Sequence, residues 1–224
     1  MVTEWPFIAY VAEGALLIVD LIDRCQAPFL RAEAELAENV TNARIRELMA
    51  GRSTARRALR LIGVEPTPIL SRSDGAPVWP LGLCGSISHS HRHIAVLLAR
   101  SSHYESVGID IDDGRPLGVA ASATVATAQE LAVIDRAGWK VPGSTAENLA
   151  FSAKEAIFKC QFPVTLDASL DFLDVSLEPG ESAGNVKIRV IDSERPALSQ
   201  VADRFHIQAL SAFDVTVVYA FLGR

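Results

Sequence analysis

Hydrophobic and polar positions repeat with two different periods along this chain, and the periods separate the expected strands from the expected helices. Short aliphatic runs bounded by turn residues predict strands. We expect strands at residues 15–21, 94–99, 107–113, 174–177, 186–192, 205–212 and 215–221. The last four follow one another closely, which is typical of an antiparallel sheet.

The longest helical pattern covers residues 41–61, where apolar side chains recur every three or four positions and Gly63 ends the helix. Its arginines are spaced at multiples of four residues, so we expect them to line the exposed side: Arg44, Arg52, Arg56 and Arg60. Such a stripe is usually a solvated face, although planar guanidinium groups also suit phosphate oxygens. Residues 31–39 are predicted to be an acidic helix or loop with solvated glutamates, Glu33, Glu35 and Glu38.

Two carboxylates share one face of the strand expected at residues 107–113, because side chains alternate along a strand. Asp110 and Asp112 would repel each other there and would be costly to desolvate. The pattern indicates a bound cation, protonation or solvent exposure, and we favour a cation.

A third oxygen ligand is available from a helix expected at residues 151–160, where Glu155 lies away from the apolar stripe. Three carboxylates, Asp110, Asp112 and Glu155, form a hard-oxygen set that suits Mg²⁺ better than zinc. Lys154 and Lys159 beside them indicate an anionic, phosphate-bearing ligand.

The same residues also have a purely structural interpretation. Ser152 and Glu155 form a capping-box pattern, and Glu155 with Lys159 is an ordinary i, i+4 pair. A helix that began earlier, capped at Ser144, would instead leave Glu155 in mid-helix. A metal site and a solvated strand beside a salt-bridged helix therefore both stay open.

Glycines and small polar residues precede His89 in the stretch 82–90 and offer donors to a phosphate. His89, His91 and His93 occupy alternate positions and would share one face of a strand, so a zinc site is a second hypothesis for this stretch. No cysteine or acidic partner lies at close spacing, so His91 and His93 are expected in a loop or on the surface.

Composition narrows the class of protein. The 224 residues carry a formal net charge of −6, which argues against general nucleic-acid binding. Three cysteines without a C-x-x-C motif indicate neither a disulfide framework nor a zinc ribbon. Neither a signal peptide nor a membrane span is expected, so we expect a cytoplasmic protein with no membrane partner.

The order of elements predicts an α+β fold of two similar halves that meet near residues 105–108, with the boundary placed at 107/108. Five motifs occur in sequence between residues 44 and 160: Gly51-Arg52 with Arg56, PVWP at 77–80, GSISHS at 85–90, VGIDID at 107–112, and FSAKE at 151–155 followed by Phe158-Lys159. Together they resemble the 4'-phosphopantetheinyl transferases, closest to the enterobactin synthase component D and surfactin-type group.

The resemblance implies transfer of the 4'-phosphopantetheine arm of coenzyme A to a serine of an apo carrier protein, with release of adenosine 3',5'-bisphosphate. It also implies two pseudo-symmetric halves, each a long helix packed on a mainly antiparallel sheet, with a ligand cleft between them. Residues 1–107 would then form the 3'-phosphate and adenine side, and residues 108–224 the metal and catalytic side. Such a pseudo-dimeric chain is expected to be a monomer.

Site residues implied by the resemblance fall into three groups. The Mg²⁺ ligands are Asp110, Asp112 and Glu155; the 3'-phosphate and adenine contacts are Ser88, His89, Arg52 and either Arg44 or Arg56; and the pyrophosphate contacts are Lys154 and Lys159. Glu155 would act as general base, directly or through a water on the metal, and Lys159 would stabilise or protonate the departing phosphate.

Two departures from the family pattern matter. Asp112 stands where Glu is usual, and Ala76 stands where some relatives have lysine. Two alternatives are a catalytically silent module that binds coenzyme A or a carrier protein, and a Mg²⁺-dependent phosphohydrolase.

Overall fold

The computed structural model describes residues 6–117, 124–139, 144–180, 185–192 and 194–224, which form an α+β fold of antiparallel sheets and helices. The chain divides into two compact units, unit 1 from Met1 to His103 and unit 2 from Tyr104 to Arg224. The division lies at the start of a strand rather than after residue 107. Among the described residues, no helix combines the length and the apolar character needed to cross a bilayer.

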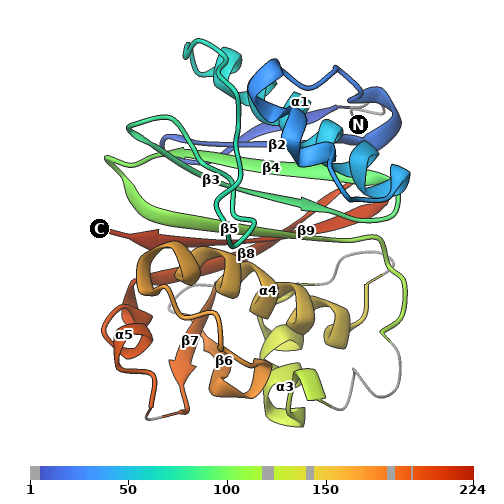
Figure 1. The fold of residues 1–224 in the computed structure, drawn as a ribbon. Coiled ribbons are helices and arrows are strands. Elements are labelled where there is room, and N and C mark those ends of the chain that lie inside the picture. The colour runs from blue at the N-terminus through green and yellow to red at the C-terminus, as the bar shows by residue number, and fades with distance from the viewer. Residues whose placement is uncertain (1–5, 118–123, 140–143, 181–184, 193) are drawn as a thin grey trace. The chain divides into compact units, whose positions relative to one another are not determined.

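Unit 1 is a four-stranded antiparallel sheet with one long helix against it (Figure 1). The sheet order is β1-β2-β4-β3, and the elements are β1 (Phe7–Ala12), β2 (Ala15–Leu21), β3 (Leu83–His89), β4 (His93–Arg100) and α1 (Asn42–Leu61), with short 3₁₀ turns η1 (Ile22–Arg24) and η2 (Arg31–Ala37). Aliphatic residues of β2 and β4 pack against Ala55, Ala58 and Leu59 of α1. The strands expected at 15–21 and 94–99 and the helix expected at 41–61 are confirmed.

The expectation that four arginines line an exposed side of α1 is wrong for two of them. Arg52 and Arg56 are only 5% and 4% exposed, because residues around Pro28 and Ile69 cover this side of the helix. Arg52 donates to the Ile69 carbonyl at 3.0 Å and to the Ser71 hydroxyl at 2.7 Å.

The expectation that Glu33 is solvated is also wrong, because its side chain is fully buried. Its carboxylate lies 2.5 Å from Arg56 Nη1 and accepts the backbone N–H groups of Leu30 and Ile69. Glu35 and Glu38 are exposed, as expected. The buried pair therefore joins α1 to η2 and to the segment at Ile69.

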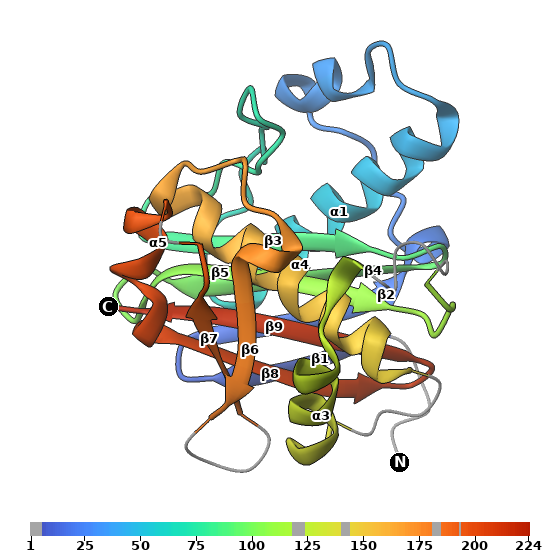
Figure 2. The same ribbon diagram turned by 90° about the horizontal axis from the view of Figure 1, so that it is seen from below.

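Unit 2 is a five-stranded antiparallel sheet in the order β5-β9-β8-β7-β6, with helices on one face (Figure 2). Its strands are β5 (Tyr104–Asp112), β6 (Val175–Pro179), β7 (Val186–Val190), β8 (Phe205–Ala212) and β9 (Val215–Gly223). Its helices are α3 (Ala128–Arg136), α4 (Ala146–Thr165) and α5 (Pro196–Ser199), with 3₁₀ turns η3 (Phe172–Asp174) and η4 (Ala202–Arg204).

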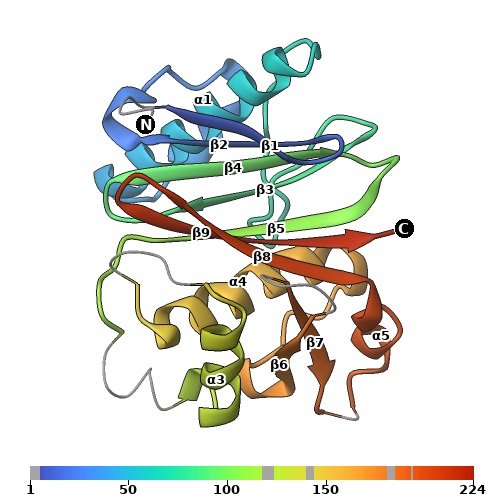
Figure 3. The same ribbon diagram turned by 180° about the vertical axis from the view of Figure 1, so that it is seen from behind.

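The antiparallel strands expected in the C-terminal region are confirmed, and β8 and β9 form the long hairpin drawn in red in Figure 3. Buried residues of α4 pack on this sheet, among them Ala153, Ile157 and Cys160. The sheet thus supports α4 along its length.

Helix α4 touches strand β5 through backbone atoms at Gly108. A Cβ built on Gly108 would lie 1.9 Å from the Ala156 carbonyl oxygen and 2.7 Å from the Cys160 nitrogen. Only glycine fits between the strand and the helix there, because any side chain would overlap the helix backbone. The close approach fixes the distance at which the next residues of β5 face α4.

Helix α4 begins earlier than the Ser152 capping box predicts. Its N-cap is Thr145, whose hydroxyl accepts the Asn148 backbone N–H. The alternative of an earlier start is therefore correct, although the cap is Thr145 rather than Ser144. Ser152 and Glu155 lie inside the helix, so helix capping does not explain either residue.

Candidate functional site

Both acids of β5 contact side chains of α4 in unit 2. Asp110 is 8% exposed; its Oδ1 accepts from Lys159 Nζ at 2.7 Å and its Oδ2 from Ser152 Oγ at 2.9 Å. The ammonium neutralises the buried carboxylate, which would otherwise be costly to desolvate. A bound cation was expected beside Asp110; the positive charge that the structure places there is the ammonium of Lys159.

Asp112 is held by three donors. Its Oδ1 accepts the Gly114 backbone N–H at 2.9 Å and Asn148 Nδ2 at 3.0 Å, and its Oδ2 accepts Ser144 Oγ at 2.6 Å. A carboxylate has about four acceptor positions, so these bonds fix the orientation of Asp112 and leave room for another partner.

The α4 residues that face the two acids form one stripe. Asn148, Ser152, Glu155 and Lys159 are spaced by four, three and four residues, which places them on one side of a helix. Sequence reasoning missed the roles of Asn148 and Ser152. Their spacing from Glu155 and Lys159 was the available signal, because it continues the same stripe toward the start of α4.

Glu155 shares Lys159 with Asp110, since Lys159 Nζ lies 3.8 Å from Glu155 Oε2 and 2.7 Å from Asp110 Oδ1. Burial raises the pKa of Glu155, and the negative charge of Asp110 raises it further, while Lys159 partly offsets both effects. The side chains of Glu155 and Lys159 remain 31% and 27% exposed. An accessible carboxyl with a raised pKa beside an ammonium group is suited to move a proton.

Lys154 lies inside unit 2 rather than beside Lys159. It is 2% exposed, and its ammonium contacts Glu130 Oε1 at 2.7 Å and the carbonyls of Val125 and Phe172 at 2.8 and 2.7 Å. These three acceptors match the three N–H donors of a lysine. The structure therefore gives Lys154 an internal role and supplies no support for the predicted pyrophosphate contact.

A cavity of about 340 Å³ adjoins Glu155 within unit 2. Helix α4 contributes Lys154, Glu155 and Phe158 to its lining, and residues 168–172 and Val175 complete it. This volume is in the lower range of small-molecule pockets. A ligand bound in it would lie directly beside the raised-pKa carboxyl.

In unit 1, two of the predicted nucleotide contacts, Arg44 and His89, lie in direct contact. Arg44 Nη1 lies 2.9 Å from His89 Nε2, and Glu47 lies 3.0 Å from the same Arg44 nitrogen. Ser88 is buried on the other face of β3, as expected for neighbouring strand residues. Arg52 and Arg56 are buried in the contacts described above.

Among the residues that the structure describes, no three His, Cys, Asp or Glu side chains are grouped closely enough to hold a metal ion. His93 was expected in a loop or on the surface, but it is buried at the start of β4 and contacts Ser90. The zinc interpretation therefore gains no support.

Comparisons with known proteins agree with these motifs. Residues 32–99 match the family model of the 4'-phosphopantetheinyl transferase N-terminal domain, and residues 106–212 match that of the 4'-phosphopantetheinyl transferase superfamily. The chain is 32% identical over 159 residues to 4'-phosphopantetheinyl transferase Svp of Streptomyces mobaraensis, covering 71% of this chain and 64% of that protein.

Two other relatives match over shorter regions. The identity to 4'-phosphopantetheinyl transferase PptT of Mycobacterium tuberculosis is 33%, covering 61% of this chain and 59% of that protein. The identity to enterobactin synthase component D of Escherichia coli K12 is also 33%, covering 58% and 61%. The chain thus spans about three fifths of the length of the curated relatives it matches. On the two family models, which together run from residue 32 to residue 212, the chain belongs to the 4'-phosphopantetheinyl transferase superfamily.

Proposed function

We propose that this protein transfers the 4'-phosphopantetheine arm of coenzyme A to a serine of an apo carrier protein and releases adenosine 3',5'-bisphosphate. The observation that carries the proposal is the polar stripe of α4 facing Asp110 and Asp112, with a raised-pKa Glu155 beside Lys159. The family and the names of the relatives support the reaction class.

In this reaction the serine oxygen bonds to the phosphorus that carries pantetheine, and the bond from that phosphorus to the bridging pyrophosphate oxygen breaks. Glu155 accepts the serine proton, directly or through a water, since its raised pKa makes it a better base than an ordinary glutamate. Lys159 donates a hydrogen bond to the departing phosphate, where negative charge develops. Asp110 and Ser152 orient this machinery through their bonds to α4 and β5.

Asp110, Asp112 and Glu155 would hold Mg²⁺. All three supply the carboxylate oxygens that Mg²⁺ prefers. Among the described residues they are not grouped closely enough to hold an ion, and Lys159 Nζ lies 2.7 Å from Asp110, so binding would require the carboxylates to converge and the ammonium to move away. When bound, Mg²⁺ supplies positive charge to the phosphate oxygens. Transfer is accordingly expected to stop in EDTA and to return on addition of excess Mg²⁺, and transfer that persists in EDTA would remove the metal from the proposal.

Arg44 and His89 are the residues of unit 1 that we assign to the 3'-phosphate of coenzyme A. Both are accessible, with 47% and 35% of their side chains exposed, and their polar atoms lie together. Arg52 and Arg56 would act indirectly, by fixing α1 through their buried contacts.

The cavity beside Glu155 would take the pantetheine arm. The arm starts at the reacting phosphorus, so its binding site has to begin next to the base. The cavity does so, and it offers the apolar side chains of Phe158, Leu170 and Phe172 as well as polar groups. A long, uncharged amide chain suits such a mixed lining.

Mass spectrometry of an apo carrier protein incubated with coenzyme A, Mg²⁺ and this protein tests the proposal. We expect the carrier to gain the mass of one phosphopantetheine group on serine. An unmodified carrier with intact coenzyme A would indicate a silent binding module, and cleavage of coenzyme A without a carrier would indicate a phosphohydrolase. Either result would overturn the proposed transfer.

A further inference from the structure

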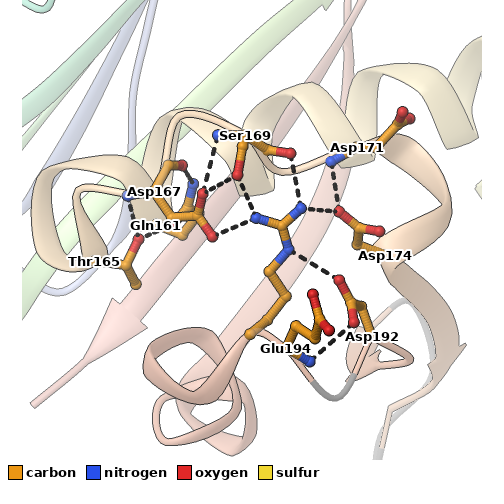
Figure 4. A network of polar contacts seen from close by, with 9 residues as sticks. Gln161, Thr165, Asp167, Ser169, Asp171, Asp174, Asp192 and Glu194 are labelled. Carbon is orange, nitrogen blue, oxygen red and sulfur yellow. Dashed lines mark hydrogen bonds and ion pairs between the residues drawn. The ribbon is translucent and has the colours of Figure 1, made fainter.

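Arg195, which precedes α5, is the centre of a network of acidic side chains in unit 2. Its Nη1 donates to Asp167 Oδ2 at 2.7 Å and to Ser169 Oγ at 2.5 Å, and its Nη2 donates to the Ser169 carbonyl and to Asp174 Oδ2, both at 2.8 Å. Asp192 Oδ2 lies 3.3 Å from its Nε. Figure 4 shows these carboxylates converging on the guanidinium from several sides.

The network holds one particular segment of the chain. Asp167, Ser169 and Asp174 all belong to the connection between α4 and β6, and residues 168–172 of this connection form a wall of the cavity beside Glu155. Arg195 therefore binds Asp167 and Asp174 on either side of that wall and Ser169 within it, although it is not among the described residues that line the cavity.

Regular secondary structure does little to shape this wall. Residues 172–174 form a 3₁₀ turn, and local bonds include Ser169 N to Asp167 Oδ1 at 2.9 Å and Asp171 N to Asp174 Oδ2 at 2.8 Å. From α4, Gln161 donates to the Asp167 carbonyl at 2.8 Å and Lys154 to the Phe172 carbonyl at 2.7 Å. The aspartates that accept these local bonds also bind Arg195. The guanidinium thus ties the two local turns together.

A single exposed ion pair contributes little, but a guanidinium that donates several bonds to a network is the exception. The Arg195 side chain is 15% exposed and makes four hydrogen bonds to the wall segment. Its loss would leave three aspartates near one another without their shared cation. The wall would then keep its bonds to Gln161 and Lys154 of α4 but lose those that join Asp167, Ser169 and Asp174 to one another.

We propose that Arg195 is a positioning residue that presets the cavity wall for the pantetheine arm. The inference rests on the proposed function, in which this cavity receives the arm. A preset wall needs no ordering when the ligand binds, so affinity is gained for the part of coenzyme A that enters the cavity. The nucleotide part of the ligand would not benefit.

Calorimetric binding of two ligands separates these parts, because adenosine 3',5'-bisphosphate is coenzyme A without the arm and its phosphate. We expect Arg195→Met to bind coenzyme A about tenfold more weakly than the unchanged protein and adenosine 3',5'-bisphosphate equally well. The matched control is Arg204→Met, which removes an arginine that binds Glu105 and the Gly223 carbonyl at 2.9 and 3.0 Å, away from the wall segment. This control is expected to bind both ligands normally.

A second variant tests the inference if Arg195→Met does not fold. Asp174→Asn keeps the shape of the side chain but removes the charge that faces Arg195, and Asp174 is not among the described cavity residues. We expect it to weaken coenzyme A binding severalfold, and we expect the double variant to bind no more weakly than Arg195→Met alone.

Normal coenzyme A affinity in folded Arg195→Met, or an equal loss for both ligands, would overturn the inference. If Arg195→Met does not fold, normal coenzyme A affinity in Asp174→Asn would overturn it instead. Failure of the proposed function has a different result, because the unchanged protein would then leave the apo carrier unmodified.

Discussion

Gly108→Ala is the substitution for which the structure predicts the largest effect from a single methyl group. The new Cβ would lie 1.9 Å from the Ala156 carbonyl oxygen, whereas ordinary contacts begin at 3.4 Å. Helix α4 or strand β5 would have to move by about 1.5 Å, the difference between these distances, because both neighbours are backbone atoms in a packed core.

This movement has two measurable consequences. Overpacking against backbone should lower the free energy of unfolding by about 3 kcal/mol or more, although alanine normally stabilises a chain relative to glycine. The displacement would also separate Asp110 from Ser152 and Lys159, which it now contacts at 2.9 and 2.7 Å. Misplacement by about 1 Å can cost on the order of 10²-fold in rate, so transfer should slow by at least this factor.

Urea unfolding and single-turnover transfer measure the two consequences. Gly223→Ala on β9 is the matched control, because the nearest atom to its new Cβ would be 3.7 Å away. We expect the control to lie within about 0.5 kcal/mol of the unchanged protein. A Gly108→Ala protein as stable as this control would refute the close helix–strand contact.

Three further substitutions test other features. Glu33→Gln should lower the free energy of unfolding by about 3–5 kcal/mol in urea, because it leaves the buried Arg56 without its counter-charge; a loss below about 1 kcal/mol would contradict the pair. Burial alone would raise the pKa of Glu130, but hydrogen bonds from Lys154 and the Thr127 N–H outweigh it and hold this pKa below its ordinary value of 4.5. The ionised Glu130 should therefore stabilise the fold fully above pH 4.5, and this stabilisation should decline as the pH falls through the lowered pKa. The urea midpoint of Glu130→Gln should fall less steeply with decreasing pH than that of the unchanged protein. Equal dependence of the two midpoints on pH would contradict this role of Glu130. Leu166 ends α4 at φ +58° with 63% of its surface exposed, so Leu166→Asn should raise the unfolding free energy by about 0.5 kcal/mol; a lower melting temperature would argue against strain there.

Strands and long helices were predictable because their signals are local. The aliphatic runs at residues 15–21 and 205–212 match β2 and β8 along their full lengths. Asp110 and Asp112 were expected on one face of a strand, and both bind α4. Alternation and helical spacing decide which residues share a face, and this information lies within a few neighbouring positions.

What covers a face was not predictable, because it depends on segments far apart in the chain. The spacing of Arg52 and Arg56 is compatible with an exposed stripe, but residues near Pro28 and Ile69 cover them. Lys154 looked equivalent to Lys159 in the sequence, yet Glu130 lies close to its ammonium. Arg195 belongs to no motif, and its partners span residues 167–192. Long-range packing decides all of these cases.

The role of Glu155 is tested by comparing the single-turnover rate of phosphopantetheine transfer by the unchanged protein with that by Glu155→Gln, at saturating coenzyme A and Mg²⁺. Glu147→Gln, on the first turn of the same helix, is the control for loss of a charge. We expect a loss on the order of 10³-fold for Glu155→Gln and almost none for the control. A Glu155→Gln rate within tenfold of the unchanged protein would contradict the assignment of transfer to this site.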